Sequence, residues 1–384
     1  MKKITNVLVL LVALVALTSQ MAKAQDEFKP SGKVFGTVFG DYYWVASAAN
    51  STDTKPVSPF LSGANSFNSN VKDFSAFDFR RIQLGYTYNF TPTLMGQISY
   101  DNDGTEATVS SVASGASAKN LAPNLRDAYI KWEIFKGSNL WIGLQPTFTY
   151  DASDKVWGHR FIEREVTDFR GSISSRDQGI SLRGKIDEKG LFNYAVMLGN
   201  SSGTSYETDK YKTVYGLLAI KPIDGLEIDL FANDNIKQAN TNPSGTDMSS
   251  IVYGAFAGIK KEKFSFGLEY FSRSDKNAWT DPASKSVIDL NGYGFSIYAT
   301  GKITNKLGAF ARYDISDPNT SADSKGDSRT MGMVGLDWFA ISNLVISPNI
   351  EWEGYEDLAT TPPPASGSSI KSTMLARLTF YWKF

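Results

Sequence analysis

The chain has 384 residues and a nearly balanced charge, with 39 lysines and arginines against 40 aspartates and glutamates. The sequence has no basic run and no cysteine. The first absence argues against a nucleic-acid-binding protein, and the second excludes a disulfide framework and a cysteine-linked lipid. Hydrophobic residues make up 42% of the chain and aromatic residues 13%, a composition expected of a wall in which only alternate residues face lipid.

The first 24 residues have the features of a secretory signal peptide. A positive start at Lys2 and Lys3 precedes an apolar run, Val7 to Leu17, and an A-x-A cleavage site at 22–24. A membrane-spanning helix needs about 20 residues, and this run is shorter. We predict cleavage after residue 24, so that the mature chain starts at Gln25. Removing Lys2, Lys3 and Lys23 leaves 36 basic and 40 acidic residues, a formal charge of −4.

The remaining residues, 25–384, show a two-residue period of hydrophobicity that predicts β-strands. In residues 81–90, apolar side chains from Ile82 to Phe90 alternate with polar ones from Arg81 to Asn89. The same alternation recurs along the chain. We predict sixteen strands at residues 33–45, 77–90, 94–101, 125–134, 140–148, 177–186, 191–198, 212–221, 226–234, 250–260, 264–273, 291–300, 307–314, 329–339, 344–353 and 370–384.

The connections between these strands alternate in length. Short turns such as 187–190 and 223–225 follow even-numbered strands, whereas long polar connections such as 46–76 and 102–124 follow odd-numbered ones. The last strand ends with Phe380, Trp382 and Phe384 on its apolar side, and aromatic rings suit a membrane–water interface. These features predict one domain: an all-β, sixteen-stranded antiparallel transmembrane β-barrel in the bacterial outer membrane, in contact with its lipid.

A soluble secreted all-β protein, such as a propeller or a set of sandwiches, is the alternative fold. The sequence shows no blade-like repeat, and this alternative does not account for the aromatic last strand. A barrel of sixteen strands encloses a water-filled channel. We therefore predict a pore for ions and small hydrophilic solutes. The candidate wall residues, all basic and at inward positions, are Arg81, Lys131, Arg183, Arg312 and Arg377.

The third long connection, residues 150–176, carries five acidic and five basic residues. The spacing of Trp157, Phe161, Ile162, Val166 and Phe169 predicts a short helix with one apolar side. We expect this loop to fold into the barrel and to place charges across the lumen, as the constriction of a selective channel does. An extracellular loop with a surface helix is the alternative. The candidate constriction residues are Arg160, Glu163, Arg164, Glu165, Asp168 and Arg170.

Three stretches carry a resemblance to a known family. Residues 161–164 (FIER), followed by 175–180 (SRDQGI), and the late strand 308–314 (GAFARYD) resemble the phosphate-selective porin O and P family. The resemblance extends loosely over most of residues 25–384, and it implies a homotrimeric sixteen-stranded porin with a folded third loop. The leader resembles those of exported Bacteroidetes proteins. The third loop has no net charge, and the inward positions show no continuous basic ladder. The sequence therefore does not indicate which solute the pore carries.

Two other functions are alternatives to a pore. An outer-membrane enzyme would need a nucleophile with a base, and the one histidine, His159, is more often a solvated loop residue than a catalytic one. The sequence predicts no catalytic residue, no metal site and no cofactor. A barrel that binds partners through its outer loops is the other alternative, and a sealed rather than conducting barrel would favour it.

Overall fold

The structure, a computed structural model, describes residues 28–47, 72–73, 75–102, 123–170, 173–208, 210–237, 248–280, 286–320, 328–356 and 372–384. The predicted signal peptide, residues 1–24, lies outside these ranges. Most of the predicted long connections 46–76 and 102–124 also lie outside them.

All sixteen predicted strands are present, close to the predicted positions. They are β1 (Ser31–Ser47), β2 (Ser75–Asn89), β3 (Leu94–Asp101), β4 (Asn124–Phe135), β5 (Ser138–Pro146), β6 (Arg176–Lys185), β7 (Phe192–Gly199), β8 (Thr213–Ile220), β9 (Leu226–Lys237), β10 (Met248–Lys260), β11 (Phe264–Thr280), β12 (Val287–Lys302), β13 (Leu307–Asp317), β14 (Arg329–Ile341), β15 (Leu344–Tyr355) and β16 (Thr373–Lys383).

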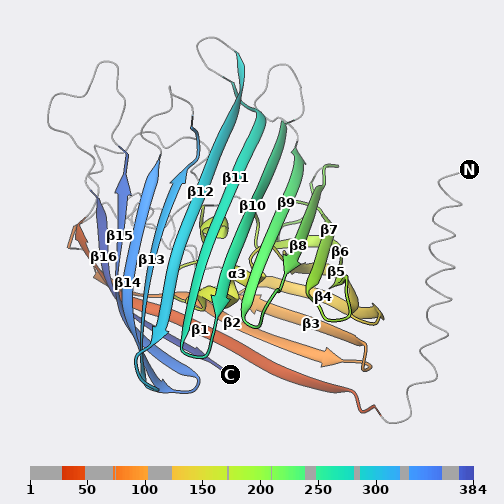
Figure 1. The fold of residues 1–384 in the computed structure, drawn as a ribbon, viewed down its shortest axis with the longest axis horizontal. Coiled ribbons are helices and arrows are strands. Elements are labelled where there is room, and N and C mark those ends of the chain that lie inside the picture. Colours follow the sequence, from red (N-terminus) through yellow and green to blue (C-terminus); the bar gives the residue numbers. More distant parts are fainter. Residues whose placement is uncertain are drawn as a thin grey trace, which may run out of the picture.

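The strands form a closed antiparallel barrel, which confirms the predicted fold class (Figure 1). Each strand pairs with its neighbours in sequence, and β16 returns to pair with β1. Phe384 continues this closure beyond the last strand, because its backbone N–H donates to Gly36 O at 3.1 Å and its carbonyl oxygen accepts from Gly36 N at 3.0 Å. Closure removes the unpaired strand edges of an open sheet.

The two faces of the wall have the polarity predicted from the alternation. On β16, Met374, Leu378 and Trp382 are exposed on the outside, whereas Arg377 and Thr379 are buried on the inside. The same division holds on β2, β3, β4 and β11, whose outward apolar residues are exposed or half-buried. The barrel therefore has an apolar outer face and a largely polar interior.

Two β-bulges change which residues point inward. On β2, Phe39 of β1 pairs with Arg81 and Gly40 pairs with Phe79, so Arg80 is the extra residue. On β4, the pairing passes from Asp127 to Leu125, so Arg126 is the extra residue. An extra residue interrupts the alternation of faces. As a result, two basic side chains that strict alternation would place on the outer face join the interior.

Candidate functional site

The connection between β5 and β6, residues 147–175 and called here the β5–β6 segment, contains two helices. These are α3 (Asp151–Trp157) and α4 (Val166–Phe169). The short helix predicted from the spacing of residues 157–169 is not formed as one helix, because α3 ends at Gly158, which adopts a left-handed conformation with φ of 66°. Glycine reaches that conformation without the steric cost of a side chain. Among the described residues, no helix is long and apolar enough to cross a membrane.

The predicted apolar side of the segment is nevertheless buried. Trp157, Phe161, Ile162 and Phe169 join one apolar cluster with side chains from β1, β10, β12, β13, β14 and β16. Val166 joins a second cluster, which includes side chains from β7, β8, β9, β10 and β11. Apolar contacts therefore connect the segment to strands on many sides of the barrel.

Three arginines of the wall donate hydrogen bonds to backbone carbonyl oxygens of the segment. Arg80 of β2 donates to Ile162 O at 2.8 Å and also to Phe161 O. Arg312 of β13 donates to Arg164 O at 2.6 Å, and Arg377 of β16 to Ile162 O at 3.4 Å. Carbonyl oxygens of an irregular segment need such partners when they are buried. The predicted wall residues Arg312 and Arg377 therefore hold the segment in place.

These two arginines are also paired with wall carboxylates. Arg312 donates to Asp314 at 2.6 Å, and Arg377 forms an ion pair with Glu351. Within the segment, Arg170 pairs with Glu353 of β15 at 3.0 Å, and both side chains are almost fully buried. A charge that is buried and neutralised in this way contributes little field to a lumen. Arg170, Arg312 and Arg377 are therefore structural residues in this arrangement.

Arg160 is the centre of an ion-pair group inside the segment. Its guanidinium lies 2.6 Å from the Glu165 carboxylate and 2.5 Å from that of Asp168. Burial opposes ionisation of Asp168, but the positive charges of Arg160 and then Arg164 outweigh it, so the pKa of Asp168 lies below its usual value. Burial, followed by the charge of Asp154, raises the pKa of Glu165 well above its usual range. Arg160 is therefore paired with both carboxylates.

The two remaining predicted residues of the segment differ in exposure. Glu163 is buried; its backbone oxygen accepts from the Trp157 indole at 2.9 Å, and its carboxylate accepts from the backbone N–H of Arg164 at 2.8 Å. The Arg164 side chain is 41% exposed and lies 3.6 Å from Asp168. Of the six predicted residues, Glu163, Glu165, Asp168 and Arg170 are buried.

A cavity of about 660 Å³ lies between the segment and the inner faces of β1, β2, β4 and β16. Seven basic and two acidic side chains line it. Of the predicted residues, the cavity brings together Arg81 and Arg160. The charged residues around it are Arg81, Arg126, Lys155, Arg160, Arg176, Lys260 and Lys383 on the basic side, with Asp151 and Asp154 on the acidic side.

Arg81, Arg126 and Arg176 form a ladder held by carboxylates. Asp101 lies 2.9 Å from Arg81 and 2.6 Å from Arg126, and Asp127 lies 2.8 Å from Arg176. The three arginine side chains are 12–17% exposed, whereas the two carboxylates are at most 4% exposed. The positive groups therefore face the cavity and the negative groups lie behind them.

Strict alternation along the strands predicts no such ladder, because the ladder depends on the bulge at Arg126. The adjacent charges Arg80-Arg81 and Arg126-Asp127 are a signal that could have revealed it. In a strictly alternating strand, one member of each pair would face the outside, where a charge in lipid costs roughly 2–4 kcal/mol. In β2 and β4, these adjacent charges therefore mark the two bulges.

The last two predicted wall residues lie around Trp141 of β5. The Lys131 ammonium is 5.3 Å from the Trp141 ring centroid and the Arg183 guanidinium is 4.3 Å from it. Arg183 also donates to the Gln145 side chain at 2.8 Å and lies 3.8 Å from the exposed Asp151. Cation–π contacts of this kind orient basic side chains along an aromatic surface.

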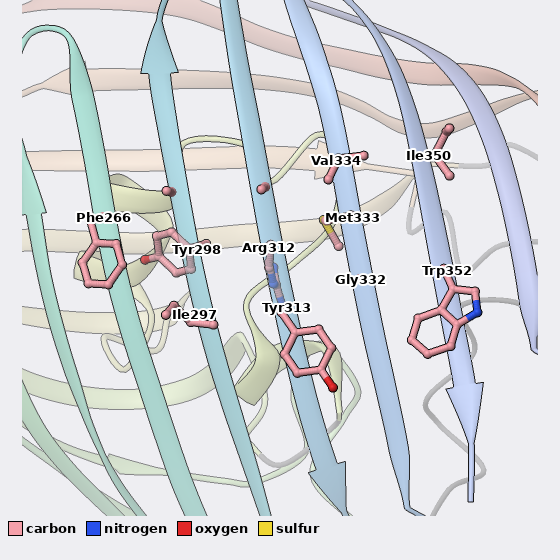
Figure 2. Close-up of a pocket in the computed structure, with 12 residues that line it drawn as sticks. Phe266, Ile297, Tyr298, Arg312, Tyr313, Gly332, Met333, Val334, Ile350 and Trp352 are labelled. Atoms are coloured by element: carbon pink, nitrogen blue, oxygen red, sulfur yellow. The ribbon is translucent and has the colours of Figure 1, made fainter.

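A second hollow, of about 560 Å³, lies on the outer face over β11 to β15 (Figure 2). The small residues Ala299, Ala311 and Gly332 leave room there between larger exposed side chains such as Tyr313 and Trp352. This hollow is apolar and faces away from the charged interior.

The single histidine is already engaged in hydrogen bonds. His159 Nδ1 lies 2.8 Å from Trp157 O, and Nε2 lies 2.7 Å from the Asp337 carboxylate. Neither ring nitrogen is left to activate a nucleophile. Within the described ranges, no group of three or more histidine, aspartate or glutamate side chains is arranged to hold a metal ion.

No protein-family model matches the chain, and no curated protein matches it. Among solved structures, the outer membrane channel DcaP of Acinetobacter baumannii is 13% identical, with a TM-score of 0.62 over 94% of this chain and 99% of that one. The anion-selective porin from Comamonas acidovorans is 12% identical, with a TM-score of 0.60 over 93% and 100%.

A trimer form of OmpT, an outer membrane protein of Vibrio cholerae, is 11% identical, with a TM-score of 0.58 over 93% of this chain and 100% of that one. These likenesses extend over nearly the whole length of each chain. At such low identities they establish the fold alone: the chain has the barrel fold of outer-membrane porins.

Proposed function

We propose that the protein is an outer-membrane porin that allows ions and small hydrophilic solutes to diffuse passively. The observation that carries this proposal is the closed sixteen-stranded barrel with an apolar outside and a polar inside. Its apolar face would contact lipid, and barrels of this size leave an aqueous channel. Residues 1–24 would direct export and be removed, and residues 25–384 would form one barrel domain.

We infer that the β5–β6 segment lies in the lumen and forms the constriction. This inference is supported by the strands that the segment contacts, which run from β10 through β16 to β2. Each of these contacts is made by a side chain on the inner face. A segment outside the barrel could not reach strands on opposite sides at once. The cavity of about 660 Å³ would then be part of the permeation path.

The charge arrangement around that cavity favours anions over cations. Arginine and lysine groups face the cavity, while the carboxylates that pair with Arg81, Arg126 and Arg176 lie behind them. Guanidinium groups bind carboxylate and phosphate oxygens through paired hydrogen bonds. Phosphate is therefore one of the anions that this site would attract, in keeping with the sequence resemblance to the O and P family.

A homotrimer is the assembly we propose, supported by that resemblance and by the trimer form of the structurally similar OmpT. In such a trimer, part of the outer wall would contact lipid and part would contact the neighbouring subunits.

Conductance in planar bilayers tests the pore itself. Purified protein in symmetrical KCl should give stepwise current increments proportional to voltage, and replacing chloride with phosphate should reduce the current while phosphate occupies the cavity. Folded barrels that insert without any conductance would contradict the proposal and favour a binding role through the outer loops.

A further inference from the structure

The cavity that carries the arginines also has an aromatic side. Phe161 of the β5–β6 segment stacks on Tyr381 of β16, with ring centroids 4.6 Å apart and ring planes 3° apart. Phe39 of β1 meets the edge of Tyr381, with centroids 6.4 Å apart. All three rings line the cavity. Phe39 and Phe161 are each 6% exposed and Tyr381 is half-buried, so Tyr381 presents most of this aromatic side, called here the ring surface.

The ring surface and the basic side meet at Arg81. Its guanidinium carbon lies 5.3 Å from the centroid of the Phe39 ring, and both residues line the same cavity. A single small solute in this cavity can therefore contact the aromatic surface and the Arg81 guanidinium at the same time.

A small inorganic anion would use only half of this arrangement. Phosphate needs hydrogen-bond donors and gains nothing from apolar rings. Ring surface that stays in contact with water carries a free-energy cost of about 25 cal/mol for each Å². A flat apolar group laid against the rings would recover that free energy, while its attached anion would reach the arginines. A volume of about 660 Å³ accommodates a molecule of this kind.

We propose that the cavity binds organic anions in which a carboxylate is joined to a flat apolar group, as in aromatic carboxylates. This inference rests on the proposed anion-preferring pore and names the class of solute it favours. The ring surface of Phe39, Phe161 and Tyr381 holds the apolar group. Arg81, together with the other arginines of the ladder, holds the carboxylate.

Block of the chloride current tests the inference. Benzoate, acetate and benzyl alcohol are each added to wild-type channels in planar bilayers, and the concentration for half-maximal block is measured. Benzoate should block at a roughly tenfold lower concentration than acetate, since an aromatic contact contributes on this scale. Benzyl alcohol, which has the ring without the charge, should block weakly.

Variants assign the effect to the ring surface. Tyr381→Leu and, separately, Phe161→Leu should bring the benzoate value close to that of acetate. Phe256→Leu is the matched control, because Phe256 is a buried phenylalanine of the same apolar cluster that does not line the cavity. Either ring variant suffices if the other fails to fold, as judged by the mobility of unheated protein in detergent gels.

Three results would overturn the inference: equal block by benzoate and acetate, equal block by benzoate and benzyl alcohol, or a benzoate advantage that survives in both ring variants. The reversal potential in a KCl gradient, recorded in the same bilayers, reports on the proposed function separately. Anion preference without a benzoate advantage would reject this inference alone, whereas absence of anion preference would reject the proposed anion preference of the pore.

Discussion

His159 and Asp337 connect the β5–β6 segment to strand β14, with 2.7 Å between the imidazole Nε2 and the carboxylate oxygen. The residues are 178 positions apart in sequence. The same ring contacts Trp157 O through Nδ1, so it joins the end of α3 to the opposite wall. Because the described part of the segment has only two short helices, such contacts determine where it lies.

Replacing His159 with leucine keeps most of the side-chain volume and removes both hydrogen bonds. We expect the segment to loosen by roughly 1–3 kcal/mol, since Asp337 would stay buried with one partner fewer. Hydrogen–deuterium exchange of peptides covering residues 151–170 measures the change. Asp224→Asn, at a carboxylate that is 99% exposed in a turn, is the control and should leave these peptides unchanged. Unaltered protection in His159→Leu would show that the pair does not hold the segment.

Arg160→Ala tests the ion-pair group inside the segment. The substitution leaves Glu165 and Asp168 buried without their arginine, a loss that costs roughly 3–5 kcal/mol. Arg164→Ala is a neighbouring control, because that side chain is 41% exposed and a surface pair contributes at most about 1 kcal/mol. Limited proteolysis should cleave the Arg160→Ala segment far faster. Equal cleavage of the two variants would contradict the assigned roles.

The segment should also be sensitive to acid. The pKa of Asp168 lies below its usual 3.8, because the charges of Arg160 and then Arg164 outweigh the effect of burial. A lowered pKa means that ionised Asp168 stabilises the docked segment above about pH 4, and that this contribution is lost as the pH falls through the lowered value.

Single-channel records between pH 7 and pH 3 can detect this loss as additional current fluctuations. The fluctuations should begin below pH 4 in the wild type and be present already at pH 7 in Asp168→Asn. Steady currents down to pH 3, or an onset near pH 6, would contradict the role of Asp168.

The barrel was predictable because its wall imposes a simple rule. Each strand residue faces either the apolar outside or the polar inside, so Ile82 and Arg81, or Leu378 and Arg377, differ in chemistry as well as in direction. Strand positions and wall polarity follow from that alternation, and the lengths of the connections give the order of strands.

The site was less predictable, since it depends on departures from the rule. At two bulges, the side chains of Arg80 and Arg126 join the interior, where strict alternation would not place them. Gly158 divides a sequence whose apolar spacing looks helical throughout. Pairs such as Arg170 with Glu353 also depend on how strands are staggered around the barrel, which one sequence does not reveal. Consequently, the sequence does not reveal which charges of the segment line the cavity.

The reversal potential in a KCl gradient tests the central claim, that the basic cavity selects anions. Wild-type channels should give the sign of chloride preference, and Arg126→Gln combined with Arg176→Gln should move the potential towards cation preference. Arg329→Gln, a wall arginine of β14 that does not line the cavity, is the matched control and should keep the wild-type value. A wild-type channel that prefers potassium, or an equal shift in the control, would contradict the claim.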